Sequence, residues 1–378
     1  MRLGLISYDF DPPIGGLGIH VKRLVKAMKK ESPDLEVIVL SPSSQAGEGA
    51  SNLARRRWNK KGGCPLFSLT LLWTLSAFVQ KNSLDLLHAQ SGSGGVFLVR
   101  KPSVPLIVTA HHTYIDEVHL VCMSPLKKIT KWMMSRLEKR TYRLADCILC
   151  VSKDTARSLI EQYGISSEKI TIIENSIDVD RFRNLSSSAR NPKKLLYIGR
   201  LEKRKGVDVL LKAFRIVAEK DPDVSLTLAG ANLIGDSIIT FLKEHRLESR
   251  VHMTGRISDQ QMIELLSSEG ILIVPSLLEG FGLIAAEGMA AGIPVLVSDS
   301  PGLRSIVKDR ETGYLFRSSD AEDLARVLQE MVHDGSINSV ARRAREEALV
   351  RFDPAKQAGE TIRVYQVEKS EGRSQKAE

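Results

Sequence analysis

Short apolar segments alternate with longer helical patterns along most of the 378-residue chain, and this alternation constrains the fold more than any other feature. Strand-like runs, beginning with residues 3–7, recur at intervals that leave room for a helix between them. This order is typical of a parallel sheet covered by helices on both faces, because parallel strands need a crossover connection. The sequence therefore predicts an α/β protein.

The alternation occurs in two series. A stretch of polar and helix-breaking residues, 184–193, separates them and is the expected linker. The expected strands lie at residues 3–7, 36–40, 85–89, 106–110, 147–152 and 170–173, and then at 194–198, 225–229, 251–254, 271–274 and 295–298. We expect two doubly wound, Rossmann-like domains, residues 1–185 and 186–353, that face a central cleft. Ligands of such sheets bind beyond the carboxyl ends of the strands, so the cleft should hold the active site.

Charge and composition narrow the possible partners. Lys and Arg number 54 against 45 Asp and Glu, which gives a net charge of +9 and a pI near 9.3. A nucleotide diphosphate, an anionic membrane or a nucleic acid would suit this charge. Aromatic residues make up 5% of the chain, and no nucleic-acid-binding motif accompanies the charge, so we expect no nucleic-acid partner.

Several segments indicate the cellular setting. Cys147 and Cys150 lie in the apolar run CILCVS and are interpreted as strand residues, not as a redox or metal pair. The N-terminus lacks the sustained apolar core of a signal peptide. The most hydrophobic long segment, residues 65–79, is shorter than the ~20 residues of a membrane-spanning helix and is expected to be a buried helix. We therefore expect a cytoplasmic protein.

Residues 272–298 place two carboxylates around a strand-to-helix turn. Glycines precede the helix formers that begin at Leu283, so the turn should open a helix whose free N–H groups attract an anion. Glu279 lies at the mouth of the turn, and Glu287 lies about two turns further along. Isolated glutamates would be ordinary surface charges. Flanked by two strands and glycines, this pair suits a polyol such as a sugar or a ribose, because each carboxylate accepts hydrogen bonds from two hydroxyls.

With its flanks PSLLEGFGL and AAGIPVLVSD, this pair resembles the E-x7-E signature of retaining glycosyltransferases of GT-B architecture, family 4. The resemblance covers residues 1 to 366. It implies that Glu279 contacts the donor sugar near the reaction centre and that Glu287 holds the nucleotide ribose. It also assigns the turn to donor binding, through Phe281, Gly282 and Leu283.

A basic segment, GRLEKRKG, follows the first strand of the second domain. Arg200 and Lys205 would neutralise a diphosphate there, and would stabilise the charge that builds on it as a leaving group, without a metal ion. A solvated basic loop is the alternative, and we expect it to hold for Lys203 and Arg204. Arg200 and Lys205 match the family pattern G-R-L-x-x-x-K-G and are predicted to be functional.

The first domain contributes two further candidates through the resemblance. The turn GGLG opens the first helix, and Gly16 is the expected contact with the diphosphate. His111 follows the strand PLIVTA and matches a T-x-H element near the donor sugar. His112 stands where an Asp is common, which leaves the role of Asp116 open. His88 is interpreted as a packing residue at a strand end.

The resemblance also implies a terminal helix within residues 354–378 that packs back on the first domain. The polar and charged end of the chain, from residue 369, is expected to be disordered.

Together these residues predict a retaining, hexosyl-type glycosyltransferase. It would move a sugar from a nucleotide diphosphate sugar to a hydroxyl of a glycan, a lipid-linked acceptor or a small molecule. The expected catalytic residues are His111, Glu279, Arg200 and Lys205, and no metal or other cofactor is expected. Two alternatives stay open: a nucleotide-sugar epimerase of the same architecture, and a non-catalytic nucleotide-sugar binder.

Residues 126–143 interleave Lys and Arg with large apolar side chains, among them Ile129, Trp132 and Met133. An interfacial helix has this composition, which predicts peripheral contact with an anionic membrane, at its inner face. The alternative is an ordinary helix with a core stripe and a solvated basic face.

Overall fold

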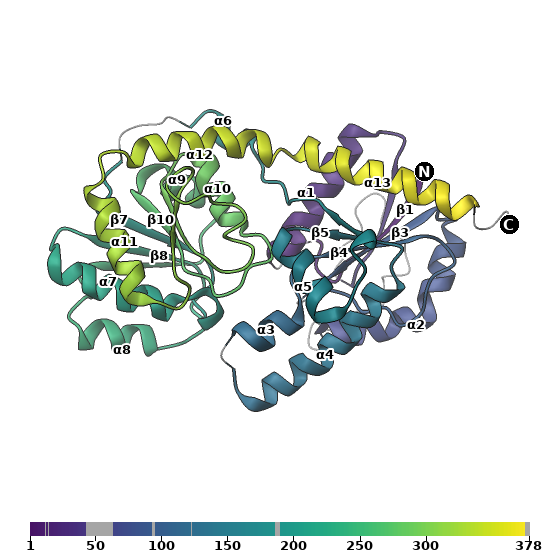
Figure 1. The fold of residues 1–378 in the computed structure, drawn as a ribbon, viewed down its shortest axis with the longest axis horizontal. Coiled ribbons are helices and arrows are strands. Elements are labelled where there is room, and N and C mark those ends of the chain that lie inside the picture. The colour runs from purple at the N-terminus through teal and green to yellow at the C-terminus, as the bar shows by residue number, and fades with distance from the viewer. Residues whose placement is uncertain are drawn as a thin grey trace. The chain divides into compact units, whose positions relative to one another are not determined.

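The computed structural model describes residues 1–42 except 12 and 14, 63–121 except 93 and 94, 123–185, and 190–374. The chain divides into two compact units (Figure 1). Unit 1 comprises residues 1–119, 123–176 and 354–378, and unit 2 comprises residues 120–122 and 177–353. Unit 1 is therefore discontinuous, because the last segment of the chain belongs with the first.

Unit 1 is built on a six-stranded parallel sheet with the strand order β2-β1-β3-β4-β5-β6. The strands are β1 (Arg2–Ile6), β2 (Glu36–Leu40), β3 (Leu86–Ser91), β4 (Leu106–Ala110), β5 (Cys147–Cys150) and β6 (Ile170–Ile172). The central strands β3, β4 and β5 are buried along their whole length, as expected of a sheet covered on both faces. The direction of strand addition reverses between β1 and β3. Ligands of doubly wound sheets bind at such a switch point.

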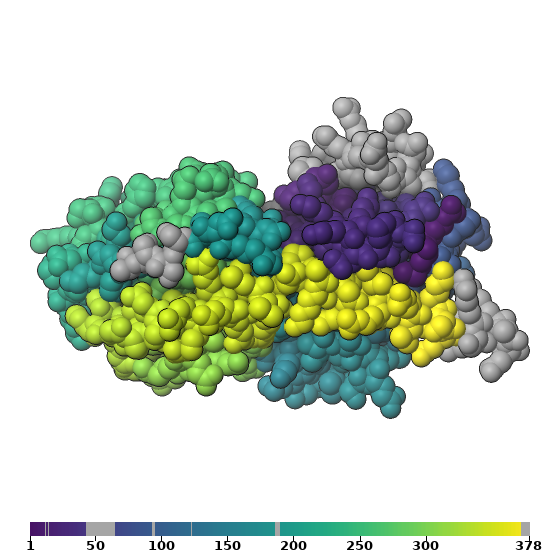
Figure 2. Space-filling view, turned by 90° about the horizontal axis from the view of Figure 1, so that it is seen from above, coloured from purple at the N-terminus to yellow at the C-terminus, as the bar shows by residue number. Residues whose placement is uncertain are grey.

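Seven helices of unit 1 are described: α1 (Gly16–Glu31), α2 (Gly63–Lys81), α3 (Tyr114–Leu120), α4 (Pro125–Leu144), α5 (Lys153–Tyr163), the short η3 (Ser167–Lys169) and α13 (Pro354–Ser374). Helix α13 lies alongside α1 (Figure 2). Ala358 and Tyr365 of α13 share a buried cluster with Leu24 of α1 and Leu5 of β1. The last helix thus completes the core of unit 1.

The expected disorder from residue 369 onward is wrong as far as residue 374, because α13 continues to Ser374. Lys369 Nζ lies 3.0 Å from a carboxylate oxygen of Asp85, which anchors this part of the helix to unit 1. Residues 375–378 lie outside the described part of the chain.

Two sequence expectations for unit 1 are tested by side-chain burial. Cys147 and Cys150 are buried free thiols within β5, so their interpretation as strand residues is confirmed. The apolar segment 65–79 lies within α2, as expected, but it is buried on one side only: Phe78 is fully buried and Trp73 is 75% exposed. None of the described helices is long and apolar enough to cross a membrane.

Unit 2 has its own six-stranded parallel sheet, with the order β12-β11-β10-β7-β8-β9. The strands are β7 (Lys194–Ile198), β8 (Ser225–Ala229), β9 (Val251–Gly255), β10 (Ile271–Val274), β11 (Val295–Ser298) and β12 (Tyr314–Phe316). The switch point of this sheet lies between β7 and β10, which are paired neighbours. The loops that follow these two strands are therefore the place to look for a ligand site.

The helices described for unit 2 are α6 (Asp180–Arg183), the short η4 (Lys203–Lys205), α7 (Val207–Lys220), α8 (Ser237–Glu244), α9 (Asp259–Ser268), α10 (Leu283–Ala291), α11 (Ala321–His333) and α12 (Ile337–Arg351). Helix α10 is buried from Ala285 to Ala291 and is followed directly by the buried strand β11. Of the expected linker 184–193, residues 186–189 lie outside the described residues.

Candidate functional site

The loops after β7 and β10 meet at the switch point of unit 2. The backbone N–H of Leu277 donates to the carbonyl oxygen of Arg204 at 2.9 Å, so the two loops are joined through their main chains. Gly206 follows η4 with a φ of +69°, and a β-carbon there would overlap the carbonyl oxygen of Pro275. Glycine is required at this position for its conformation and for the close approach of the two loops.

Lys205 and Glu279 form an ion pair within this junction. Their side chains are 19% and 12% exposed, and Ser276 Oγ donates to Glu279 Oε1 at 2.8 Å. Burial opposes ionisation of Glu279, but Lys205 and Arg204 together outweigh it and hold the pKa of its carboxyl at about 2. Burial lowers the pKa of Lys205. The site therefore carries an ionised carboxylate in contact with a desolvated ammonium.

Arg204, which we expected to be solvated, is covered by the loop that follows β10. Its guanidinium is 19% exposed, donates to the carbonyl oxygen of Leu278 at 2.9 Å, and lies 3.2 Å from Glu202. The expectation of a solvated side chain is wrong here, because the loop after β10 folds over Arg204 and supplies acceptors. A GRLEKRKG motif alone does not reveal which of its basic residues the neighbouring loop will cover.

Arg200 is exposed, as is Lys203 of the same segment. It follows β7, its side chain is 58% exposed, and its guanidinium lies 3.1 Å from Glu202. The carbonyl oxygen of Arg200 accepts a hydrogen bond of 2.7 Å from the buried Tyr197 hydroxyl, which fixes the backbone while leaving the guanidinium in solvent. A charged donor in this setting is accessible to an anionic ligand.

The turn into α10 presents main chain, while its aromatic side chain points into the core. Gly282 has a φ of +97° and precedes the first helical residue, Leu283. The Phe281 ring is buried edge-on against Phe352, with 5.4 Å between centroids, so only its main chain is available for donor binding. The first N–H groups of a helix have no intrahelical partner, and they favour an anion. Glu287, inside α10, is 8% exposed.

At the switch point of unit 1, the glycine turn before α1 is organised by a residue that the sequence analysis did not assign. Asp9 is buried, and one of its carboxylate oxygens accepts from the N–H groups of Gly15 at 2.9 Å and Gly18 at 3.1 Å. A β-carbon on Gly18 would overlap that carboxylate. Gly16, the expected diphosphate contact, is exposed as the first residue of α1.

His111 follows the carboxyl end of β4 and is 8% exposed. Its Nε2 lies 2.8 Å from Oε1 of the buried Gln90, and its ring lies edge-on to His20 of α1 at 5.0 Å. Burial lowers the pKa of His111 to about 3, and the nearby His112 and His88 act in the same direction. His111 is therefore neutral near pH 7.

The neighbours of His111 have structural partners. His112 Nε2 lies 3.0 Å from Glu117. Asp116 accepts from the hydroxyls of Thr113 at 2.6 Å and Ser158 at 2.8 Å, so the role left open for it is an anchor between α3 and α5. His88 is fully buried, as expected of a packing residue, but it lies within β3 and not at a strand end.

The candidate residues thus fall into two groups, one in each unit. Arg200, Lys205, Glu279, Glu287 and residues 281–283 belong to unit 2, where Lys205 and Glu279 are in direct contact. Gly16 and His111 belong to unit 1, each following a strand of its sheet. Among the described residues, no group of three or more His, Cys, Asp or Glu side chains could hold a metal ion.

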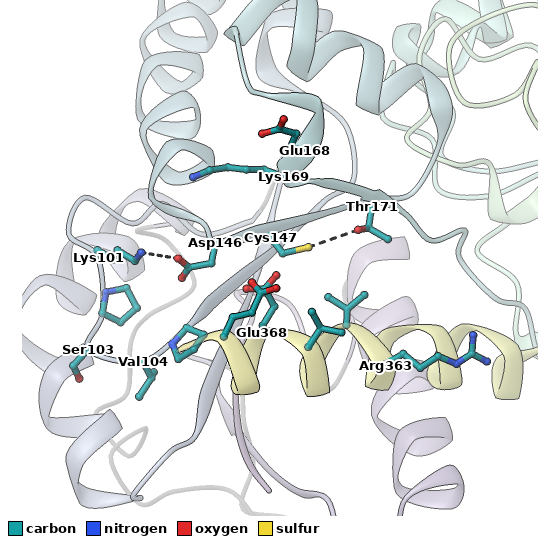
Figure 3. A pocket seen from close by; sticks show the side chains of 15 residues that line it. Lys101, Ser103, Val104, Asp146, Cys147, Glu168, Lys169, Thr171, Arg363 and Glu368 are labelled. Carbon is teal, nitrogen blue, oxygen red and sulfur yellow. Dashed lines mark hydrogen bonds and ion pairs between the residues drawn. The ribbon is translucent and has the colours of Figure 1, made fainter. Parts of the chain in front are cut away.

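A cavity of about 700 Å³ lies in unit 1 against α13, beside residues that precede or begin β4, β5 and β6 (Figure 3). It is at the amino ends of these strands, away from the switch point. Charged groups in its wall are already engaged: Lys101 Nζ lies 2.6 Å from Asp146, and Lys169 donates to the carbonyl oxygen of Ala145 at 2.9 Å. We therefore do not assign the donor site to this cavity.

Comparison with known proteins agrees with the fold and the motifs. The family model described as "Glycosyltransferase Family 4" matches residues 14–181, and the model described as "Glycosyl transferases group 1" matches residues 178–349. The chain is 26% identical to a glycogen synthase of Mycobacterium tuberculosis, covering 97% of this chain and 94% of that protein. It is also 26% identical to a phosphatidyl-myo-inositol mannosyltransferase of Mycobacterium leprae, with 98% of each chain covered.

Solved structures show the same architecture. Sucrose-phosphate synthase from Thermosynechococcus elongatus superposes with a TM-score of 0.76 at 22% identity, covering 97% of this chain and 98% of that chain. HepE of Anabaena, in complex with UDP-glucose, superposes with a TM-score of 0.72 at 18% identity, covering 97% and 100%.

Two parallel α/β sheets, each with its switch point, and the paired glutamates around α10 define a glycosyltransferase of GT-B architecture. The chain belongs to family 4 of the glycosyltransferases, the group 1 family, whose members use nucleotide-sugar donors and retain the anomeric configuration.

Proposed function

We propose that this enzyme transfers a hexose from a nucleotide diphosphate hexose to an acceptor hydroxyl without a metal ion. The observation that carries the proposal is the Lys205–Glu279 pair, placed at the switch point of unit 2 at the entrance to α10. It brings a cation, a carboxylate and a helix N-terminus into one junction. The cation and the helix N-terminus can bind a diphosphate, and the carboxylate can accept a hydrogen bond from a sugar hydroxyl.

The donor would lie along this junction. An ammonium has three N–H donors, so Lys205 can hold Glu279 and still donate to a phosphate oxygen. The exposed guanidinium of Arg200 would contact the same diphosphate, and Glu287 would accept from the ribose hydroxyls. From unit 1, we propose that Gly16 contacts the diphosphate through its N–H and that His111 contacts the donor sugar. HepE was solved with UDP-glucose, which makes a UDP-hexose the first donor to test.

In the reaction, the bond between the sugar C1 and the phosphate oxygen breaks and a bond forms between C1 and the acceptor oxygen. We propose a same-face displacement in which the departing phosphate oxygen takes the acceptor proton. Negative charge then builds on the diphosphate beside Arg200 and Lys205. Preorganised cations at that position lower the barrier, because they act where charge develops.

Arg200→Ala tests this role. Losing one well-placed charged donor should cost about 3 kcal/mol in the transition state, or roughly a hundredfold in kcat. Arg310→Ala is the matched control, since the Arg310 side chain is 57% exposed and also ion-paired, 2.8 Å from Glu330. Full turnover by Arg200→Ala would contradict the proposed role.

The alternative activities separate in one assay. The enzyme is incubated with UDP-, GDP- and ADP-hexoses, each with and without sugar and lipid acceptors, and both free nucleotide and products are measured. Nucleotide release that depends on an acceptor supports transfer. A new nucleotide sugar formed without an acceptor would instead indicate an epimerase, and binding without either product would indicate a non-catalytic binder.

The exposed surface of helix α4 supports the proposal that the acceptor is held at an anionic membrane. Its buried side chains are polar: Ser135, Glu138, Thr141 and, with its hydroxyl, Tyr142. Its large apolar side chains face solvent instead: Leu126 is 75% exposed, Ile129 58%, Trp132 46% and Met133 59%. The core-facing side of the helix is thus mainly polar, apart from Met134 and Leu144, which pack against core residues; this supports an interfacial helix over one with a core stripe.

Basic side chains surround these apolar residues. Lys127, Lys128, Arg136 and Arg140 are exposed on the same helix, and the Arg136 guanidinium lies 4.5 Å from the centre of the Trp132 ring. In Figure 1, α4 and α13 lie at opposite sides of unit 1. We propose that α4 inserts its apolar side chains among acyl chains while its basic side chains contact anionic headgroups.

Flotation with vesicles, either zwitterionic or containing anionic lipid, tests this surface. We expect binding that needs anionic lipid and weakens with salt. Leu126→Asp should reduce it about tenfold, since it removes an inserted apolar group and adds repulsion. Val350→Asp is the matched control, because Val350 of α12 is 73% exposed. Equal binding by the two variants would rule out α4 as the membrane surface.

A further inference from the structure

We propose that a buried hydrogen-bond chain from α13 determines which ring nitrogen of His111 carries the proton. Gln90, His88 and Tyr365 are then positioning residues for His111. The catalytic consequence rests on the proposed function of His111 as a contact of the donor sugar. The hydrogen-bond chain itself stands on the contacts within unit 1.

The chain has three links. The Tyr365 hydroxyl of α13 lies 2.6 Å from His88 Nδ1 in β3. His88 Nε2 lies 3.2 Å from Gln90 Nε2 and 2.6 Å from the Thr109 hydroxyl. Gln90 Oε1 lies 2.8 Å from His111 Nε2. Tyr365, His88 and Gln90 are each 0% exposed, so water does not compete for these contacts.

The amide of Gln90 couples the two histidines, because one of its atoms only donates and the other only accepts. Its carbonyl oxygen faces His111, so His111 Nε2 must carry a proton and donate. Its NH2 group faces His88, so His88 Nε2 must accept. The proton of His88 then lies on Nδ1, from which it donates to the Tyr365 hydroxyl, and Thr109 donates to His88 Nε2. Each link satisfies the next.

Both linked histidines are neutral near pH 7. The tautomer of His111 therefore determines which of its ring nitrogens donates a hydrogen bond and which accepts one. Burial lowers the pKa of His88 and of His111 to about 3. Titratable groups near the cluster are His20 and Arg23 on α1, His112 beside His111, and Glu117, which lies 3.0 Å from His112. His112 opposes protonation of His111 further.

With its proton on Nε2, His111 has a lone pair on Nδ1. A lone pair accepts a hydrogen bond and repels the acceptor-only oxygens of phosphate or carboxylate. The ligand group that His111 is prepared to meet is therefore a hydroxyl, as on a sugar. Because Tyr365 belongs to α13, the docking of the last helix takes part in this preparation.

The test is a long-range two-bond ¹H–¹⁵N correlation spectrum of the histidine rings in the full-length protein, with His111 assigned by its loss in His111→Asn. We expect the Nε2–H tautomer in the native protein. In Tyr365→Phe, the Nδ1–H group of His88 would lose its acceptor, which favours the tautomer of His88 with the proton on Nε2. The Gln90 amide would then reverse so that its oxygen accepts from His88, and its NH2 group would face His111. His111 would therefore shift toward its Nδ1–H tautomer. Tyr163→Phe is the matched control, because the Tyr163 hydroxyl is also buried but bonds to Glu138 instead.

Two outcomes would overturn the proposal: a native His111 in the Nδ1–H form, or an equal response of His111 to Tyr365→Phe and Tyr163→Phe. The spectra need no substrate, so they remain decisive if no transferase activity is found.

Turnover gives a second readout. We expect kcat of Tyr365→Phe to fall about tenfold, with the donor KM little changed, as is typical when an orienting partner of a functional histidine is lost. In Gln90→Glu, a carboxylate would face both histidines, which should raise the pKa of His111 and move the pH profile of kcat upward. An unaltered pH profile in a folded Gln90→Glu would count against the hydrogen-bond chain. A shifted tautomer with unchanged kcat would support it and would contradict the role of His111 in transfer.

Discussion

Breaking the Lys205–Glu279 pair should lower the free energy of unfolding of unit 2, by an amount that follows from the pKa shifts of the two residues. The pKa of Glu279 is about 2 against an ordinary 4.5, a difference worth about 3 kcal/mol at neutral pH. Burial lowers the pKa of Lys205, so folding disfavours the charge of the partner. The intact pair therefore contributes less than 3 kcal/mol, while Glu279→Gln, which leaves the ammonium buried without its counter-charge, should cost about 3 kcal/mol.

A double-mutant cycle isolates the interaction. We expect the effects of Glu279→Gln and Lys205→Met on stability to be coupled by about 2 kcal/mol. Either substitution alone leaves the other charge buried without a counter-charge, and the double substitution does not. The pH dependence has a definite sign. Since the folded pKa of Glu279 is depressed, its contribution is present above pH 4.5 and is lost as the pH falls toward 2. The native protein and Glu279→Gln should therefore converge in stability over this range.

The assay must report on unit 2. All three tryptophans of the sequence, at positions 58, 73 and 132, precede residue 177, so tryptophan fluorescence does not follow unit 2. Hydrogen exchange of peptides from β7 and β10 gives the local free energy of opening instead. Single effects that add within about 0.5 kcal/mol would refute the coupling and the electrostatic reasoning behind it.

Three further predictions concern other positions. Gly206→Ala should cost at least about 2 kcal/mol more by hydrogen exchange than Gly235→Ala, because both glycines have positive φ but only the first would overlap Pro275; equal costs would exclude the steric cause. Burial raises the pKa of Glu138 to about 8, so its contribution to unit 1 is full below pH 4.5 and is lost as the pH rises through 8; tryptophan-monitored urea unfolding should show this decline, and Glu138→Gln should flatten it. Glu287→Gln should raise the donor KM about tenfold with kcat nearly kept, as expected when a ribose contact shared by the ground and transition states is lost; an unchanged KM in steady-state kinetics would remove Glu287 from the donor site.

The sequence was sufficient for the sheets because their periodicity is local. Buried runs such as 271–274, bounded by Gly270 and Pro275, are readable without tertiary information. Strand β12, with three residues, and helix α3, with seven, are too short to show a period and were missed. Their positions depend on packing against neighbours that lie far away in the sequence.

The site was predictable in its residue types but less so in its contacts. Lys205 and Glu279 were assigned separately to a diphosphate and a sugar, and 74 positions separate them, so their direct contact follows only from the adjacency of β7 and β10. Asp9 and Gln90 belong to no motif. They were missed because what marks them is a burial and a partner that only the fold supplies.

The discontinuity of unit 1 has a consequence for synthesis on the ribosome. Unit 2 is nearly contiguous and can acquire its native core as soon as its last strand and helices have emerged. The N-terminal segments emerge first, yet the cluster around Leu5 and Leu24 is closed by Ala358 and Tyr365, which are translated near the end. The half of the enzyme that is made first should therefore be the last to mature, and a nascent chain arrested before α13 would expose that apolar surface to chaperones.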